Sequence, residues 1–173
     1  MKIVKSIIAV ALLFGVIYGY SLETLYFSNT FDSFYLFFRG AAIGAIVGLA
    51  CFFYYKKAAT DGLERFQLGA LFVLLGMFVG PYLAIWSNHF FAKKDPLSIN
   101  VIFQRDESIR TSRTGISKGK LPEIEGFYTY FLKNNTADRV RSKQQLFKGI
   151  ESGAEVALPI QKGFWHFDFV AIE

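Results

Sequence analysis

Three long apolar segments constrain this chain more than any other feature of its sequence. Residues 34–55 contain a single charge, Arg39, and residues 66–86 contain none. A helix needs about 20 apolar residues to cross the hydrocarbon core of a bilayer, so both segments predict membrane-spanning helices. Residues 3–20 are apolar except for Lys5 and Ser6 and predict a third spanning helix.

The first apolar segment has a second interpretation. Lys2 and Lys5, followed by an apolar run, match the beginning of a secretory signal peptide. Signal peptides end in small residues at the cleavage site, whereas this segment ends near the bulky Tyr18 and Tyr20. We therefore expect a retained helix, with a cleaved signal peptide as the alternative.

The rest of the chain is mixed in polarity and predicts a small domain of strands with one helix. Alternating apolar residues indicate strands at residues 99–103, 126–132, 156–160 and 164–172, and Asn134-Asn135 indicates a turn. Residues 137–151 carry Val140, Phe147 and Ile150 at helical spacing. The expected fold is a membrane protein with three transmembrane α-helices in residues 1–92, followed by a small α+β, β-rich extramembrane domain in residues 97–173.

Each apolar segment carries small residues four positions apart, and residues 40–48 (GAAIGAIVG) show this most clearly. Lipid gives helices no hydrophobic reason to associate, so close backbone approach at small residues supplies the packing energy. The second segment has the most small residues, and we expect it to be the centre of the bundle. The stripes serve either packing among this chain's own helices or contact with further copies or other membrane subunits. The predicted helix-packing residues are Ala11, Gly15, Gly19, Gly40, Gly44, Gly48, Gly76, Gly80 and Ala84.

Charge and cysteine content exclude several classes of function. The net charge of +5 is spread along the chain and lacks the dense basic stripe of a nucleic-acid-binding protein, so we expect no nucleic-acid partner. The single cysteine, Cys51, lies in an apolar segment and excludes a disulfide framework within the chain.

The positive residues outside the apolar segments predict an orientation. Loops with more Lys and Arg stay on the cytoplasmic side. The N-terminus and the loop after the second segment together carry Lys2, Lys5, Lys56, Lys57 and Arg65, against Lys93 and Lys94 on the other side. We expect a multi-pass protein of the cell membrane, the bacterial inner membrane being favoured, with a cytoplasmic N-terminus and an extracytoplasmic, periplasmic C-terminal domain.

Catalytic signals are weak. His166 and Asp168 lie two positions apart in the last expected strand, which would place both side chains on one face as a general base or half a metal site. No third ligand follows at a recognisable spacing, and no nucleophile elbow, phosphate-binding loop or dinucleotide fingerprint occurs. We interpret the pair as structural and expect no enzyme activity, no metal and no cofactor.

A basic loop gives the remaining candidate site. Residues 110–120 combine glycines, hydroxyl side chains and cations, which could surround a phosphate or an acidic lipid head group. A solvated charged surface explains the same residues. The candidate anion-binding residues are Arg110, Arg113, Lys118, Lys120, Arg139 and Arg141.

Together these features predict a non-enzymatic integral membrane subunit. Its glycine-striped helices would anchor or assemble a membrane protein complex, and its outer domain would dock a partner by strand addition at the C-terminal edge. The alternative is a homo-oligomeric sensor or effector whose domain binds an anionic, phosphate-bearing ligand and alters the transmembrane bundle. The expected partners are the lipid bilayer, other membrane subunits and further copies of the chain.

Overall fold

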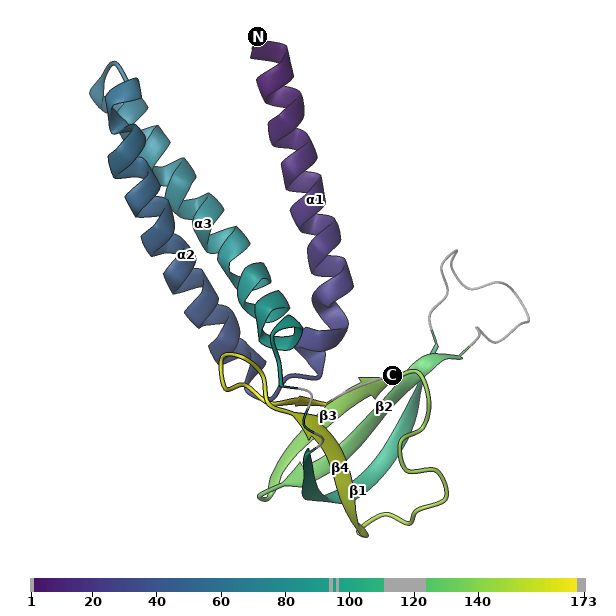
Figure 1. The fold of residues 1–173 in the computed structure, drawn as a ribbon. Helices are drawn as coiled ribbons and strands as arrows, with labels where there is room; N and C mark the ends of the chain where they lie inside the picture. The colour runs from purple at the N-terminus through teal and green to yellow at the C-terminus, as the bar shows by residue number, and fades with distance from the viewer. Residues whose placement is uncertain (1, 94, 96, 111–123, 171–173) are drawn as a thin grey trace, which may run out of the picture. The chain divides into compact units, whose positions relative to one another are not determined.

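The computed structural model describes residues 2–93, 95, 97–110 and 124–170, with side chains described from residue 14 onward except at residue 58. In this part of the chain helices come first and strands follow (Figure 1). The elements are α1 (Lys2–Ser28), α2 (Ser33–Tyr55), a short 3-10 turn η1 (Lys56–Ala58), α3 (Gly62–Phe90), β1 (Leu97–Arg110), β2 (Ile124–Lys133), β3 (Thr136–Ser142), β4 (Glu155–Gln161) and β5 (Phe169–Val170).

The chain divides into two compact units, which are described separately. The first unit holds Met1–Lys93 together with the short segment Gly163–Phe167, and the second holds Lys94–Lys162 with Asp168–Glu173. The helices thus belong to one unit and the sheet to the other.

Helices α2 and α3 are long and apolar enough to cross a membrane. They run antiparallel and side by side, as the blue and teal ribbons of Figure 1 show. A reciprocal cap makes α3 begin before the apolar segment: the Asp61 carboxylate accepts the Glu64 N–H at 2.7 Å, and the Glu64 carboxylate accepts the Thr60 N–H at 2.8 Å. The third expected span, residues 3–20, falls within α1 and stays a prediction.

The expectation that α2 is the centre of the bundle was wrong. Helix α3 packs along α2, and it is also the helix against which α1 packs most. Helix α1 reaches α3 through Tyr20, whose hydroxyl donates to the Phe78 carbonyl at 2.5 Å and whose ring lies 5.7 Å from that of Tyr82. The reason is that the small residues of α2 pack against the backbone of α3, whereas α1 contacts α3 through large side chains.

The second unit is a curled antiparallel sheet with the strand order β3-β2-β1-β4-β5. A two-residue turn joins β2 to β3, and its residues Asn134 and Asn135 have φ angles of 52° and 63°. Such left-handed turns match the twist of a hairpin, and asparagine tolerates them. The strands expected at residues 99–103, 126–132 and 156–160 lie inside β1, β2 and β4.

One face of the sheet forms the core of this unit. Phe103 pairs with Phe131 across β1 and β2, and Val101 pairs with Val156 across β1 and β4. All four side chains are buried, and the Phe131 side chain has no solvent exposure. The alternate residues form the opposite, outer face, and a register shift between Phe103 and Arg105 brings Arg105 onto that face opposite Tyr130.

The helix expected at residues 137–151 was wrong. Its first half is strand β3, which pairs with β2, and turns follow to residue 153. Val140 is buried while its neighbour Arg139 is exposed, so the period is that of a strand. The apolar spacing suggested a helix because Phe147 comes back to the core from a loop, where its ring lies 5.7 Å from that of Phe103. The α+β class is corrected accordingly: in the described part of this unit, the regular structure is all strand.

The last expected strand, residues 164–172, was also mostly wrong. Only Phe169–Val170 forms a strand, and the residues before it form a turn in which His166 has a φ of 64°. Alternation along such a strand would place Trp165, Phe167, Phe169 and Ala171 on one face, but Trp165 and Phe167 instead pack on a cluster of helix residues, Leu36, Ala84 and Ile85. Ala171 lies outside the described residues.

Candidate functional site

The glycines of α2 lie directly against α3. A Cβ on Gly44 would meet the backbone of Gly76 and Gly80, and a Cβ on Gly40 would meet Gly80, Pro81 and Ala84. Gly48 approaches the backbone of Phe72 in the same way. We call this contact line the glycine seam; among the predicted packing residues it contains Gly40, Gly44, Gly48, Gly76, Gly80 and Ala84.

The stripe on α1 is used differently. Gly19 lies against the Tyr82 ring, but a Cβ on Gly15 would meet nothing within 4 Å. The Ala11 side chain lies outside the described part of the structure. Only one described glycine of α1 therefore makes a close helix contact.

Asn88, near the end of α3, holds the segment Gly163–Phe167 against the helix. Its side-chain amide donates to the Phe167 carbonyl at 2.9 Å and accepts the Trp165 N–H at 3.0 Å. Its backbone carbonyl accepts the Phe164 N–H at 3.0 Å. Gly163 is required here because any Cβ would overlap the Asn88 side chain. Asn88 is 1% exposed, and the neighbouring Ser87 hydroxyl adds a further contact by accepting the Trp165 indole N–H at 2.9 Å.

Replacing Asn88 by Ala should therefore loosen this segment. The Trp165 N–H and the Phe167 carbonyl would lose their partner, and each unsatisfied buried group costs about 1–3 kcal/mol. We expect a lower unfolding temperature in detergent than for wild type. Gln145→Ala removes an exposed amide and serves as the control. Equal unfolding temperatures for the two variants would contradict this role of Asn88.

A contact between Glu23 and His89 joins α1 to α3 close to the Asn88 amide. The Glu23 Oε2 atom lies 3.1 Å from Nδ1 of His89, and both side chains are mostly buried. The same Nδ1 lies 3.2 Å from the Ile85 carbonyl. Because both neighbours are acceptors, these contacts are attractive when Nδ1 carries the proton. The Tyr26 ring stacks on the imidazole with 3.8 Å between ring centres.

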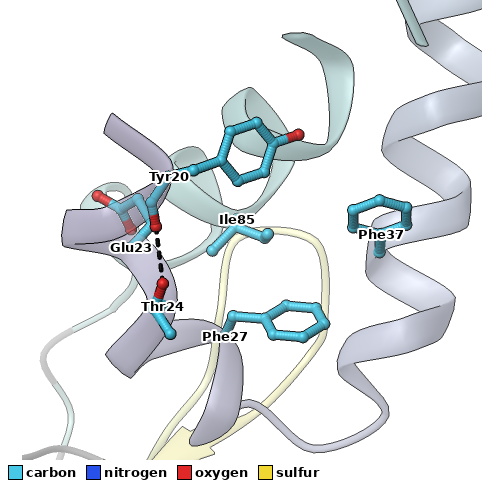
Figure 2. A pocket seen from close by; sticks show the side chains of 6 residues that line it. All are labelled: Tyr20, Glu23, Thr24, Phe27, Phe37 and Ile85. Atoms are coloured by element: carbon cyan, nitrogen blue, oxygen red, sulfur yellow. Dashed lines mark hydrogen bonds between the residues drawn. The ribbon is translucent and has the colours of Figure 1, made fainter. Parts of the chain in front are cut away.

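A small cavity of about 120 Å³ lies beside this contact, lined by residues from all three helices. Figure 2 shows the rings of Phe27 and Phe37 and the Ile85 side chain around it, while the Glu23 carboxylate points away from Phe37. Thr24 uses its hydroxyl locally, donating to the Tyr20 carbonyl at 2.9 Å. The walls of the cavity are thus almost wholly apolar, and Glu23, which contacts His89, is the one acidic residue among those that line it.

The candidate anion-binding residues are only partly placed. Arg113, Lys118 and Lys120 lie outside the described residues, and Arg110 is the last residue of β1. Arg139 and Arg141 alternate on β3 and share the outer face of the sheet. The Arg139 guanidinium lies over the Tyr128 ring at 4.7 Å, and a hydrogen bond with the Tyr130 side chain raises the pKa of Arg139.

His166 and Asp168 do not form the expected pair. They lie in a turn and not along one strand, and no hydrogen bond or ion pair joins their side chains in the structure as described. Within the same described residues, no group of three His, Cys, Asp or Glu side chains could hold a metal ion. The expectation that the protein is not an enzyme stays a prediction.

Three important residues were missed from the sequence. Asn88, Glu23 and His89 were not among the predicted site residues. A buried amide gives no periodic signal, but a glutamate inside a largely apolar helix is a signal that could have been used, since such a charge needs a partner.

Comparison with known proteins adds no functional information to this geometry. No protein-family model, curated protein or solved structure matches the chain.

Proposed function

We propose that this chain is a non-enzymatic integral membrane subunit that anchors or assembles a membrane protein complex, and that its sheet domain docks a partner. The proposal places it as a multi-pass protein in the cell membrane, with a bacterial inner membrane favoured. The N-terminus would be cytoplasmic and the sheet domain extracytoplasmic.

The glycine seam is the observation that carries this proposal. The two helices touch through backbone and small residues, so their large apolar side chains are turned outward. Exposed examples are Ile46 and Val47 on α2 and Leu71 and Leu74 on α3. Water-soluble proteins rarely expose so much continuous apolar surface, whereas lipid or another membrane subunit covers it favourably.

The distribution of positive charge supports the orientation. The turn between α2 and α3 carries Lys56 and Lys57, and Arg65 follows in the first turns of α3. The other end of the hairpin carries Lys93 and Lys94. The first group, together with Lys2 and Lys5, outweighs the second and favours the cytoplasmic side for the turn.

Purification from the native membrane tests the proposal. A tagged full chain would be extracted in mild detergent, and the proteins that copurify would be identified and quantified. We expect a small set of other membrane proteins in fixed ratio to this chain. Gly44→Leu should lower the amount of these copurifying proteins more than Gly15→Leu does. Gly15→Leu is the matched control, because only Gly44 lies in the glycine seam.

A sensor or effector is the second candidate, and one observation favours it. Arg105, Arg139 and Arg141 lie on the same outer face of the sheet, where they could bind an anionic ligand. A chain that purifies as a homo-oligomer with no other protein would favour this function over the subunit.

A further inference from the structure

The outer face of the sheet carries three arginines arranged around two tyrosines. Across three neighbouring strands, Arg105 pairs with Tyr130, and Tyr130 pairs with Arg139. In the next row on the same face, Tyr128 pairs with Arg141 on one side and with Glu107 on the other. We call this surface the Arg–Tyr face; it consists of Arg105, Glu107, Tyr128, Tyr130, Arg139 and Arg141.

Stacking on the tyrosines holds the guanidinium groups in place. Arg105 lies 4.9 Å from the centre of the Tyr130 ring, and Arg139 lies 4.7 Å from the centre of the Tyr128 ring. A stacked guanidinium keeps its N–H donors free at the edge of the plane, where carboxylates bind in pairs of hydrogen bonds. Both arginines are exposed, and Arg139 uses part of its donor set in a hydrogen bond with the Tyr130 side chain, which leaves its remaining N–H groups for a partner.

The face has one acidic member, and that residue does not neutralise it. Glu107 lies 3.9 Å from Arg105, and both side chains are more than half exposed. An exposed pair at this distance contributes little, so Arg105 can exchange Glu107 for a better carboxylate. Three positive charges against one negative charge leave a face that attracts anions and repels a second copy of itself.

Apolar residues continue the face on one side. Ile102 pairs with Leu132, and Leu132 pairs with Ala137, in the row next to Arg105, Tyr130 and Arg139. Ile102 and Ala137 are exposed and Leu132 is half-buried. Tyrosine and arginine beside aliphatic residues are the composition found at the centres of protein interfaces. A single phosphate or lipid head group would leave this apolar row unused.

We propose that the Arg–Tyr face, with the row of Ile102, Leu132 and Ala137, docks a protein partner through a surface that places Asp or Glu carboxylates beside an apolar side chain. The arginines lie on β1 and β3, two strand spacings or about 10 Å apart, so a partner with several carboxylates reaches them together. This inference rests on the proposed subunit function and replaces strand addition at the C-terminal edge, where the described strand β5 has only two residues.

Site-specific photocrosslinking in the full chain, in native membranes, tests this surface. Tyr128→p-benzoylphenylalanine places the probe within the Arg–Tyr face and keeps an aromatic ring, and Gln145→p-benzoylphenylalanine is the exposed control elsewhere in the unit. We expect the first probe to crosslink one protein, at a peptide rich in Asp and Glu. Adding Arg105→Gln and Arg139→Gln should lower the yield about tenfold, the equivalent of about 1.4 kcal/mol in binding. Lys148→Gln with Lys162→Gln removes the same charge elsewhere and should leave the yield unchanged.

Several results would overturn the docking face. These are crosslinks from position 128 to lipid or to a second copy only, a yield that the two arginine substitutions do not change, or loss of the crosslink with phosphate but not with chloride at equal ionic strength. The last result would assign the face to a phosphate-bearing ligand. If proteins copurify but position 128 gives no crosslink, the docking face is refuted and the subunit function stands. If the crosslink forms but the purified chain carries no other membrane subunit, the docking face stands and the subunit function is refuted.

Discussion

Replacing Gly44 by Leu is expected to separate α2 from α3 while leaving both helices in the membrane. A Cβ at this position already meets the Gly76 backbone, and a leucine side chain adds three further carbon atoms. Overpacking of this kind costs about 3 kcal/mol, the upper end of the usual range. Leucine inserts readily into lipid, so membrane insertion should be unaffected. The measurements are the thermal unfolding of the helices in detergent and the fraction of protein in the membrane.

Gly15→Leu is the matched control for that substitution. It introduces the same side chain at a glycine in another apolar helix, but a Cβ at Gly15 meets nothing within 4 Å. Its unfolding temperature should stay close to that of wild type. If the two leucine variants unfold alike, the glycine seam does not hold α2 and α3 together.

Replacing Phe131 by Ala is expected to unfold the sheet domain without releasing the chain from the membrane. Phe131 lies in the middle of the sheet core and has no solvent exposure. Removing a buried phenylalanine costs about 3–5 kcal/mol, and a domain of this size has a stability of roughly that amount. Limited proteolysis in detergent should cut the sheet domain rapidly while the helices remain protected.

Ile124→Ala controls for loss of an apolar side chain on the same strand. Ile124 lies at the exposed beginning of β2, so its removal should change the stability by no more than about 0.5 kcal/mol. Resistance of the Phe131→Ala domain to protease would show that the sheet core is not organised around this ring. Loss of that variant from the membrane would show that the two units do not fold separately.

The sequence predicted those elements whose signal lies within one segment. Long apolar runs gave α2 and α3, because length and hydrophobicity alone decide whether a helix can cross a bilayer. Alternation of apolar and polar residues gave the strands inside β1, β2 and β4, and two asparagines gave the turn before β3. Each of these features depends on neighbours in the chain.

The errors arose where side chains pack on distant segments. Trp165 and Phe167 alternate as in a strand, yet their partners are on α2 and α3. Phe147 and Val140 suggested a helix face because both reach the sheet core, one from a loop and one from a strand. Periodicity reports that a residue is buried but not against what it is buried.

The candidate site was harder to predict for the same reason. Asn88 and Trp165 are 77 residues apart, and Glu23 meets His89 only because α1 and α3 are neighbours. The arginines of the Arg–Tyr face lie on two strands that are separated in the sequence by β2. Single positions of this kind acquire a role only when the fold brings them together.

Cysteine accessibility at the two ends of the α2–α3 hairpin tests the central claim most directly. In a Cys51→Ala background, Lys57→Cys places a thiol in the turn between the helices, and Lys148→Cys places one on an exposed loop of the sheet domain. If both helices cross the membrane with a cytoplasmic turn, a membrane-impermeant maleimide added to intact cells should label residue 148 at once and residue 57 only after the membrane is permeabilised. The opposite pattern would reverse the orientation and keep the crossing. Equal labelling of both thiols in intact cells, or of neither until lysis, would contradict the account, because the hairpin would then not span the bilayer.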